Sequence, residues 1–169
     1  MIEYLREYYF LTKDFFQTRK KVRIVIIPLV IAGVVFYFSD TCLFYKNGLN
    51  IQTSILNVGG ILLGFTISFF AILISGNSKS MEEAKKYKTK YKISGDDVYL
   101  YTTLIMGVGY IILIESVLLI INVLSPIFFK VYSFIGRVLF SISIFLLLHS
   151  IIALLEIVKD FYFIVTKRK

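Results

Sequence analysis

The chain has 169 residues, of which 57% are hydrophobic and 18% are charged. A soluble globular domain usually has about 45–50% apolar and about 25% charged residues, and the mean hydropathy of this chain is +0.79. These values exclude an ordinary soluble domain. Once membrane segments are subtracted, the remaining residues are also too few for a separate soluble catalytic domain.

Most apolar residues lie in four blocks that are nearly free of charge, at 24–38, 51–75, 99–124 and 131–157. A membrane-spanning helix needs about 20 such residues, and the first block reaches that length only by running past Asp40. A membrane β-strand alternates over about 10 residues, whereas 111–121 is apolar on every face except at Glu115 and Ser116. The sequence therefore predicts an all-α polytopic membrane protein, with four transmembrane helices at about 24–44, 51–75, 99–124 and 131–157.

The basic residues predict the orientation of these helices. Six of the 19 Lys and Arg residues precede the first span, one lies in the first loop and six lie in the second loop (76–98). Two more lie near the third loop and four at the end of the chain. This alternation is what the positive-inside rule expects for short loops. Both termini should therefore face the cytoplasm, with the transmembrane domain at 24–165 and a basic tail at 166–169.

Residues 1–23 are predicted to form an amphipathic juxtamembrane helix on the cytoplasmic surface. Apolar and aromatic side chains recur there near the helical period, and tyrosines and phenylalanines suit the headgroup boundary. Its basic cluster, which includes Arg19, Lys20 and Lys21, would contact anionic lipids. A docking site for a cytoplasmic protein is the alternative.

The second loop carries five lysines within eight residues: Lys85, Lys86, Lys88, Lys90 and Lys92. Ser80 and Glu83 have the spacing of a capping box, which predicts that a short helix begins there, and Ser94-Gly95 would end it. The lysines could contact anionic lipids, an acidic protein partner, or the phosphates of a nucleotide or nucleic acid. No nucleic-acid-binding module is recognisable, so direct nucleic-acid binding is the least favoured of the three.

One face of the second span is small or weakly polar along its whole length. Its members recur at intervals of 3, 4, 4, 3 and 4 residues and are Asn57, Gly60, Gly64, Ser68, Ala71 and Ser75. Small residues at this spacing allow another helix to approach closely, because lipid supplies no hydrophobic force between helices. The contacting helix could belong to the same chain or to a second copy in a homo-oligomer.

Three ionisable residues are expected at membrane depth: Glu115, Arg137 and His149. Such residues are costly in a bilayer and should face protein or water. If the chain turns near Pro126, Glu115 and Arg137 lie at similar depths and could form an ion pair. Alternatively, Glu115 could line a cation-selective pore, or be neutral and donate a hydrogen bond. His149 is more typical of a buried histidine with satisfied hydrogen bonds than of a ligand or switch.

No constellation for enzymatic chemistry is recognisable. The chain has one His and one Cys, which cannot make a zinc site of the usual kind, and it has no phosphate-binding loop or nucleophile motif. We therefore expect no catalytic residues, no metal site and no cofactor.

The layout resembles a known class of membrane proteins. A basic N-terminus, a Gly-rich second span running from Gly59-Gly60 through Gly64-Phe65 to Ser75-Gly76-Asn77, and a Lys-rich loop are similar to small four-helix membrane subunits of bacterial anti-phage systems, such as the membrane component of Kiwa. The resemblance implies an inner-membrane protein that oligomerises and works beside a cytoplasmic partner.

Two functional hypotheses follow. In the first, the protein is an oligomeric subunit of the bacterial inner membrane that couples to a cytoplasmic protein through its Lys-rich loop. In the second, it is a self-contained ion channel or membrane-depolarising effector, with a pore lined by Glu115 and the small face of the second span.

Overall fold

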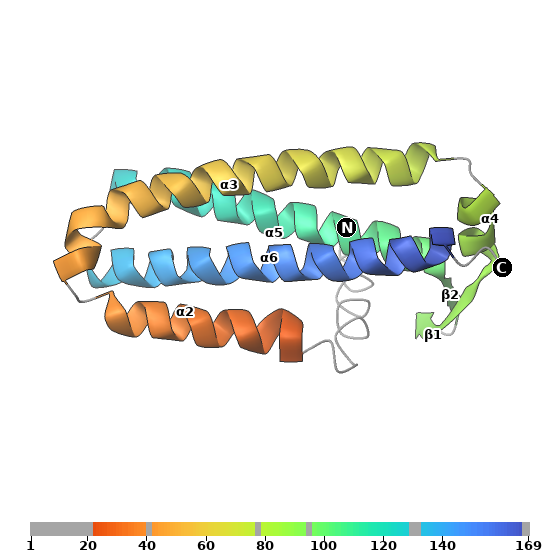
Figure 1. Cartoon of the computed structure of the whole chain (residues 1–169), viewed down its shortest axis with the longest axis horizontal. Helices are drawn as coiled ribbons and strands as arrows, with labels where there is room; N and C mark the ends of the chain where they lie inside the picture. Colours follow the sequence, from red (N-terminus) through yellow and green to blue (C-terminus); the bar gives the residue numbers. More distant parts are fainter. Residues whose placement is uncertain (1–21, 40–41, 77–78, 94–95, 129–132, 167–169) are drawn as a thin grey trace.

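The computed structural model describes residues 22–39, 42–76, 79–93, 96–128 and 133–166. A π-helical turn, η1 (Val22–Ile26), leads into α2 (Ile27–Phe38), and then come α3 (Cys42–Ser75), α4 (Lys79–Lys86), β1 (Lys88–Ile93), β2 (Asp96–Tyr99), α5 (Leu100–Phe128) and α6 (Phe134–Thr166). The helices α2, α3, α5 and α6 run along one long axis, and α4 and the β-hairpin lie at one end of it (Figure 1). We call this the α4 end, and the opposite end, where α5 gives way to α6, the Pro126 end.

Three helical segments are long and apolar enough to cross a membrane: Asn50–Ser75, Leu100–Ile127 and Phe134–Tyr162. They correspond to the second, third and fourth predicted spans. The predicted amphipathic helix at 1–23, with Arg19, Lys20 and Lys21, lies outside the described residues except for its last two positions, and so does the end of the basic tail.

The first predicted span is shorter than the other three. Its apolar helical segment is Arg23–Phe38, which rises about 24 Å at about 1.5 Å per residue, against about 30 Å of hydrocarbon. It ends where the Ser39 hydroxyl donates to the Phe36 carbonyl over 2.6 Å, and the next helix, α3, begins at Cys42. The length of this segment therefore does not establish a fourth crossing of the membrane.

Two apolar clusters hold the bundle together. The larger lies toward the α4 end and is built around Ile24, Leu73, Met81, Leu104, Val108, Ile111, Ala153, Leu154 and Ile157. The smaller joins Ile55, Leu118 and Phe140 nearer the Pro126 end. α2 packs along α6, where the rings of Phe36 and Phe134 meet edge to face with centroids 6.1 Å apart. Met81 and Ala84 are the buried side of α4, which attaches that short helix to the larger cluster.

The Lys-rich loop folds differently from the sequence prediction. The helix that begins near Ser80 ends at Lys86 instead of continuing to Ser94, and an antiparallel hairpin of β1 and β2 follows. Thr89, Tyr91 and Ile93 alternate along β1, and β-branched and aromatic residues at this period favour a strand. The Leu100 amide donates to the Tyr87 carbonyl over 2.9 Å and closes the hairpin at the start of α5.

The packing of α3 against α5 depends on the missing side chain at Gly59. A Cβ atom there would lie 3.2 Å from side-chain carbons of both Leu118 and Leu119, whereas a Cβ atom at the neighbouring Gly60 would meet nothing within 4 Å. One turn of α3 thus carries one glycine that is needed for packing in this chain and one that is not.

We predict that Gly59→Ile lowers the free energy of unfolding by about 1–3 kcal/mol, because the larger side chain must push α5 away. Gly33→Ile on α2 is the matched control, since it makes the same change of residue type at a position where an added Cβ atom meets nothing within 4 Å. Thermal unfolding followed by circular dichroism in detergent tests the difference. Equal destabilisation by the two substitutions would contradict the packing described here.

Candidate functional site

The interior of the bundle contains three groups of polar side chains, each joining different helices. The first lies at the Pro126 end. Gln52 of α3 donates from Nε2 to the Ser125 hydroxyl over 2.6 Å and, at 3.5 Å, to the Asn122 backbone carbonyl. Asn122 in turn donates from Nδ2 to the Ser143 hydroxyl of α6 over 3.0 Å. This group links α3, α5 and α6.

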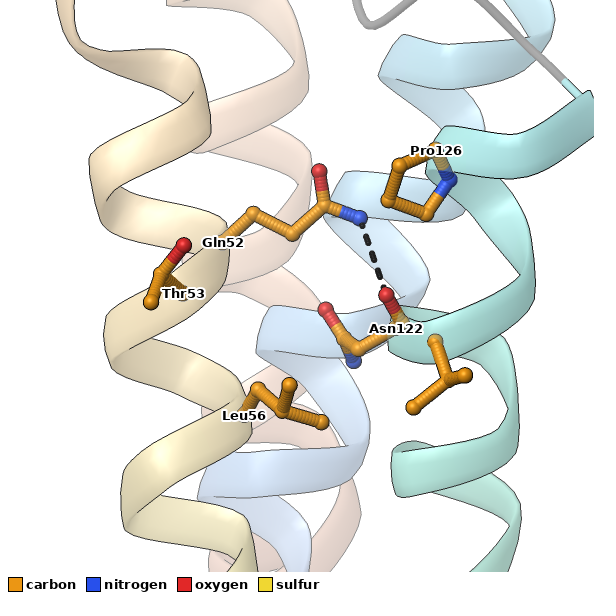
Figure 2. Close-up of a pocket in the computed structure, with 6 residues that line it drawn as sticks. Gln52, Thr53, Leu56, Asn122 and Pro126 are labelled. Carbon is orange, nitrogen blue, oxygen red and sulfur yellow. Dashed lines mark hydrogen bonds between the residues drawn. The ribbon is translucent and has the colours of Figure 1, made fainter.

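A pocket of about 270 Å³ opens beside the first group (Figure 2). Its lining residues are Gln52, Thr53, Leu56, Asn122, Val123 and Pro126. In Figure 2 the Asn122 side chain reaches from α5 toward α3, between Gln52 and Leu56. The Asn122 Nδ2 atom donates to the Leu118 carbonyl over 2.8 Å. Because a carbonyl can only accept, this contact fixes the orientation of the Asn122 amide group. The other amide atom, Oδ1, is buried and has no hydrogen-bond partner.

Proline explains why Gln52 bonds to the backbone of α5. Pro126 lies inside α5 and has no amide hydrogen, so the carbonyl four residues earlier, at Asn122, loses its helical donor. An unsatisfied backbone carbonyl is costly inside a membrane. The Gln52 amide provides a replacement donor from the neighbouring helix.

The second group lies midway along the bundle and consists of Thr66 on α3 and Glu115 on α5. Both residues have 0% relative exposure, and the Thr66 Oγ1 and Glu115 Oε1 atoms are 3.2 Å apart. The other carboxyl oxygen, Oε2, is buried and has no hydrogen-bond partner. Among the described residues, Thr66 is therefore the one side chain that makes a polar contact with Glu115.

The structure does not bring Glu115 and Arg137 together. The Asn122–Ser143 contact sets the register of α5 against α6. At about 1.5 Å per residue, Arg137 lies about 9 Å from that level toward the Pro126 end, and Glu115 lies about 10 Å in the opposite direction. The predicted ion pair fails because α5 continues through Pro126 to Phe128, which moves the turn away from the position that the sequence suggested.

The third group is centred on His149 of α6. Its Nδ1 lies 2.8 Å from the Ile24 carbonyl, and its Nε2 lies 2.9 Å from the Tyr110 hydroxyl of α5. The carbonyl can only accept, so Nδ1 carries a hydrogen, and in the neutral ring Nε2 accepts from Tyr110. Phe145, one turn earlier on α6, stacks on the imidazole with ring centroids 5.6 Å apart.

Proline again explains the backbone contact of His149. Pro28 stands four residues after Ile24 and cannot donate to its carbonyl. The imidazole therefore supplies a donor at the junction of η1 and α2, from a residue 125 positions away in the sequence. Both prolines of the chain thus leave a helical carbonyl to which a side chain of another helix donates.

The small face of α3 points away from the rest of the described residues. All six residues, Asn57, Gly60, Gly64, Ser68, Ala71 and Ser75, are exposed, whereas Ile55, Gly59, Thr66 and Leu73 form the buried side of the same helix. The hydroxyls of Ser68 and Ser75 donate to carbonyls four residues earlier on α3. The described residues of the chain therefore do not pack on this face, which was one of the two interpretations of the sequence pattern.

Large apolar side chains border the small face on both sides. Ile61, Phe65 and Ile72 flank it on one side and Ile67 and Ile74 on the other, and all five are exposed, Ile61 most of all at 73%. With 100° between successive residues, the small face lies almost opposite Thr66. The face is therefore a shallow groove between two ridges, and it points outward from the bundle.

The lysines of the second loop have unequal surroundings. Lys85 lies over the Tyr101 ring, with its Nζ 5.0 Å from the ring centroid, and Lys86 is exposed on α4. Lys88 donates to Asp97 across the hairpin over 2.6 Å, and this hydrogen bond, together with the charge of Asp97, raises the pKa of Lys88. Lys90 and Lys92 belong to β1, but their side chains lie outside the described residues.

Sequence reasoning singled out Glu115 and His149 but missed their contacts. Thr66, Tyr110, Gln52 and Asn122 are polar residues within apolar spans, which is itself a signal of bundle-facing positions. A second available signal was the carbonyl four residues before each proline, which requires a new donor.

We predict that the cost of His149→Phe depends on Pro28. In the native chain the substitution removes the donor to the Ile24 carbonyl, whereas in a Pro28→Ala background the new amide can provide that donor. A double-mutant cycle, measured by thermal unfolding in detergent, should give a coupling of about 1 kcal/mol. Strict additivity would show that proline is not the reason for this contact.

Comparison with known protein families, curated proteins and solved structures finds no match to this chain. Among the described residues there is also no group of three or more His, Cys, Asp or Glu side chains that could hold a metal ion. The functional argument therefore starts from three features: the exposed small face of α3, the basic α4 and the buried Glu115.

Proposed function

We propose that the protein is a non-catalytic membrane subunit located in a bacterial inner membrane. It pairs with a second copy of itself through the small face of α3, and it binds an acidic cytoplasmic protein through α4. The exposure of the small face carries this proposal. A helix face of small residues gives no advantage against lipid, because larger side chains make more dispersion contacts. Against another helix it allows the backbones to approach closely.

A second copy is the occupant that the shape of the face favours. The ridges of Ile61 and Phe65 on one side, and of Ile67 on the other, can lie beside the groove of an identical helix. A two-fold dimer places the same patch against itself, so a groove with ridges on both flanks satisfies both partners at once. The back-bonded serines leave no hydroxyl hydrogen that must be matched across the contact.

The proposed topology has four crossings with both termini in the cytoplasm. It is supported by Lys79, Lys85, Lys86 and Lys88, which follow α3 at the α4 end, and by Lys159 near the end of α6. α2 would be the fourth crossing. Its short apolar length would be accommodated by local thinning of the bilayer or by flanking polar residues that reach the interface.

The proposed partner surface consists of Lys79, Lys85 and Lys86. These lysines are exposed on α4, whereas the charge of Lys88 is matched by Asp97. An acidic protein and anionic lipid headgroups would both be attracted to this surface. The resemblance in layout to membrane subunits of anti-phage systems favours a protein partner, and it is also the reason for proposing a defence role.

The channel hypothesis receives no support from the arrangement of α3. A pore lined jointly by Glu115 and the small face would need both on one side of this helix. Glu115 contacts Thr66 on the buried side, and the small face is exposed on nearly the opposite side.

We predict that Gly60→Ile combined with Gly64→Ile abolishes self-association without unfolding the chain. Neither added Cβ atom meets anything within 4 Å in the monomer, but both would fill the groove. Energy transfer between labelled copies in lipid vesicles measures the association. Gly33→Ile on α2, where an added Cβ also meets nothing within 4 Å, is the matched control, and unchanged association in the double variant would refute pairing through α3.

We predict that reversing two charges on α4, with Lys85→Glu and Lys86→Glu, releases a stoichiometric protein partner during mild-detergent purification from native membranes. Lys159→Glu, which alters another exposed lysine, should retain it. Retention of the partner by the double variant would show that α4 is not the docking surface.

A further inference from the structure

The distances between oxygen atoms around Thr66 bear on the protonation state of Glu115. The Thr66 hydroxyl oxygen lies 2.9 Å from the Leu62 carbonyl and 3.2 Å from Glu115 Oε1. A hydroxyl has one hydrogen and can donate fully to only one of these two atoms. The carbonyl is the closer acceptor, and the bond to it is the usual back-bond of a helical threonine.

The contact between Thr66 and Glu115 therefore needs a hydrogen of its own. An ionised carboxylate has none, and two oxygens at 3.2 Å without a hydrogen between them would repel each other. A protonated Glu115 supplies the hydrogen from Oε1, and Thr66 then accepts from Glu115 while donating to Leu62. The remaining oxygen, Oε2, is the neutral acid's carbonyl, and leaving it without a partner costs far less than burying an unpaired charge.

Within the part of the chain that the structure describes, no cation beside Glu115 takes the place of this proton. α3 carries no titratable side chain between residues 48 and 76. On α5 and α6 the neighbouring titratable groups are Tyr110 and His149, which bond to each other, and Arg137 lies about 20 Å away along the axis by helical rise. On α2 and η1, Arg23 is exposed and Tyr37 lies toward the Pro126 end. A hard metal cation would need about six oxygen ligands, and Thr66 offers one.

We infer that Glu115 is a proton-binding site in the membrane interior, held as a neutral carboxylic acid that donates a hydrogen bond to Thr66 and so joins α5 to α3. Loss of the proton would remove the donor and leave an unpaired charge between two helices of the bundle. This inference is independent of self-association and of any cytoplasmic partner.

Infrared spectroscopy of the protein in lipid vesicles at neutral pH tests the inference. The carbonyl stretch of a protonated carboxylic acid should be present in the native protein and absent in Glu115→Gln. The two proteins differ only at residue 115, so the other acidic side chains contribute equally to both spectra, and the difference between the spectra reports on Glu115. Absence of the band from the native protein, or its persistence in Glu115→Gln, would overturn the inference.

Thr66→Val provides a second test that does not alter Glu115. Valine has nearly the shape of threonine but cannot accept a hydrogen bond, so the acid band should remain and move to the frequency of a free carboxylic acid. Ser116→Ala is the matched control, because the Ser116 hydroxyl donates to the Ile112 carbonyl on the same helix. A band that stays in place in Thr66→Val would show that Glu115 does not donate to Thr66.

Discussion

Backbone carbonyls inside an apolar bundle must find hydrogen-bond donors, and the fold of this chain depends on that requirement. Helices satisfy most carbonyls internally, but Pro28 and Pro126 each remove one amide donor. His149 and Gln52 compensate from other helices, at Ile24 and Asn122. The first contact lies about midway along the bundle and the second at the Pro126 end, and they fix α6 against the start of α2 and α3 against α5. In lipid, where apolar packing has no preferred partner, such directional bonds select one arrangement of helices.

The two sides of α3 have different surroundings in the structure. Its inner side carries Gly59, which admits Leu118 of α5, and Thr66, which contacts Glu115. Its outer side carries the small face, which no part of the described chain covers. The proposed pairing with a second copy is compatible with the packing of the chain, because the two sets of residues lie almost half a turn apart. Substitutions on the two sides should have separable effects.

Periodicity and composition predicted the long helices but not their contacts. The apolar blocks at 51–75, 99–124 and 131–157 are long helices in the structure, and the small face of α3 was visible from its spacing. The possible pairing of Glu115 with Arg137 requires the chain to turn near Pro126, whereas α5 continues past this residue to Phe128. The Lys-rich loop was predicted to be one helix because its capping box is strong, yet the strand tendency of residues 88–93 prevails after Lys86.

Hydrophobic length and residue spacing are properties of the chain alone, so the sequence was enough to predict a helical protein with segments long enough to cross a membrane. It was also enough to locate the face of α3 that carries small residues. Which side of α3 is buried, and which partners Glu115 and His149 take, became known from the tertiary structure. Those outcomes depend on the register between helices, and a register is set by a few contacts such as Asn122 with Ser143, between residues that lie far apart in the sequence.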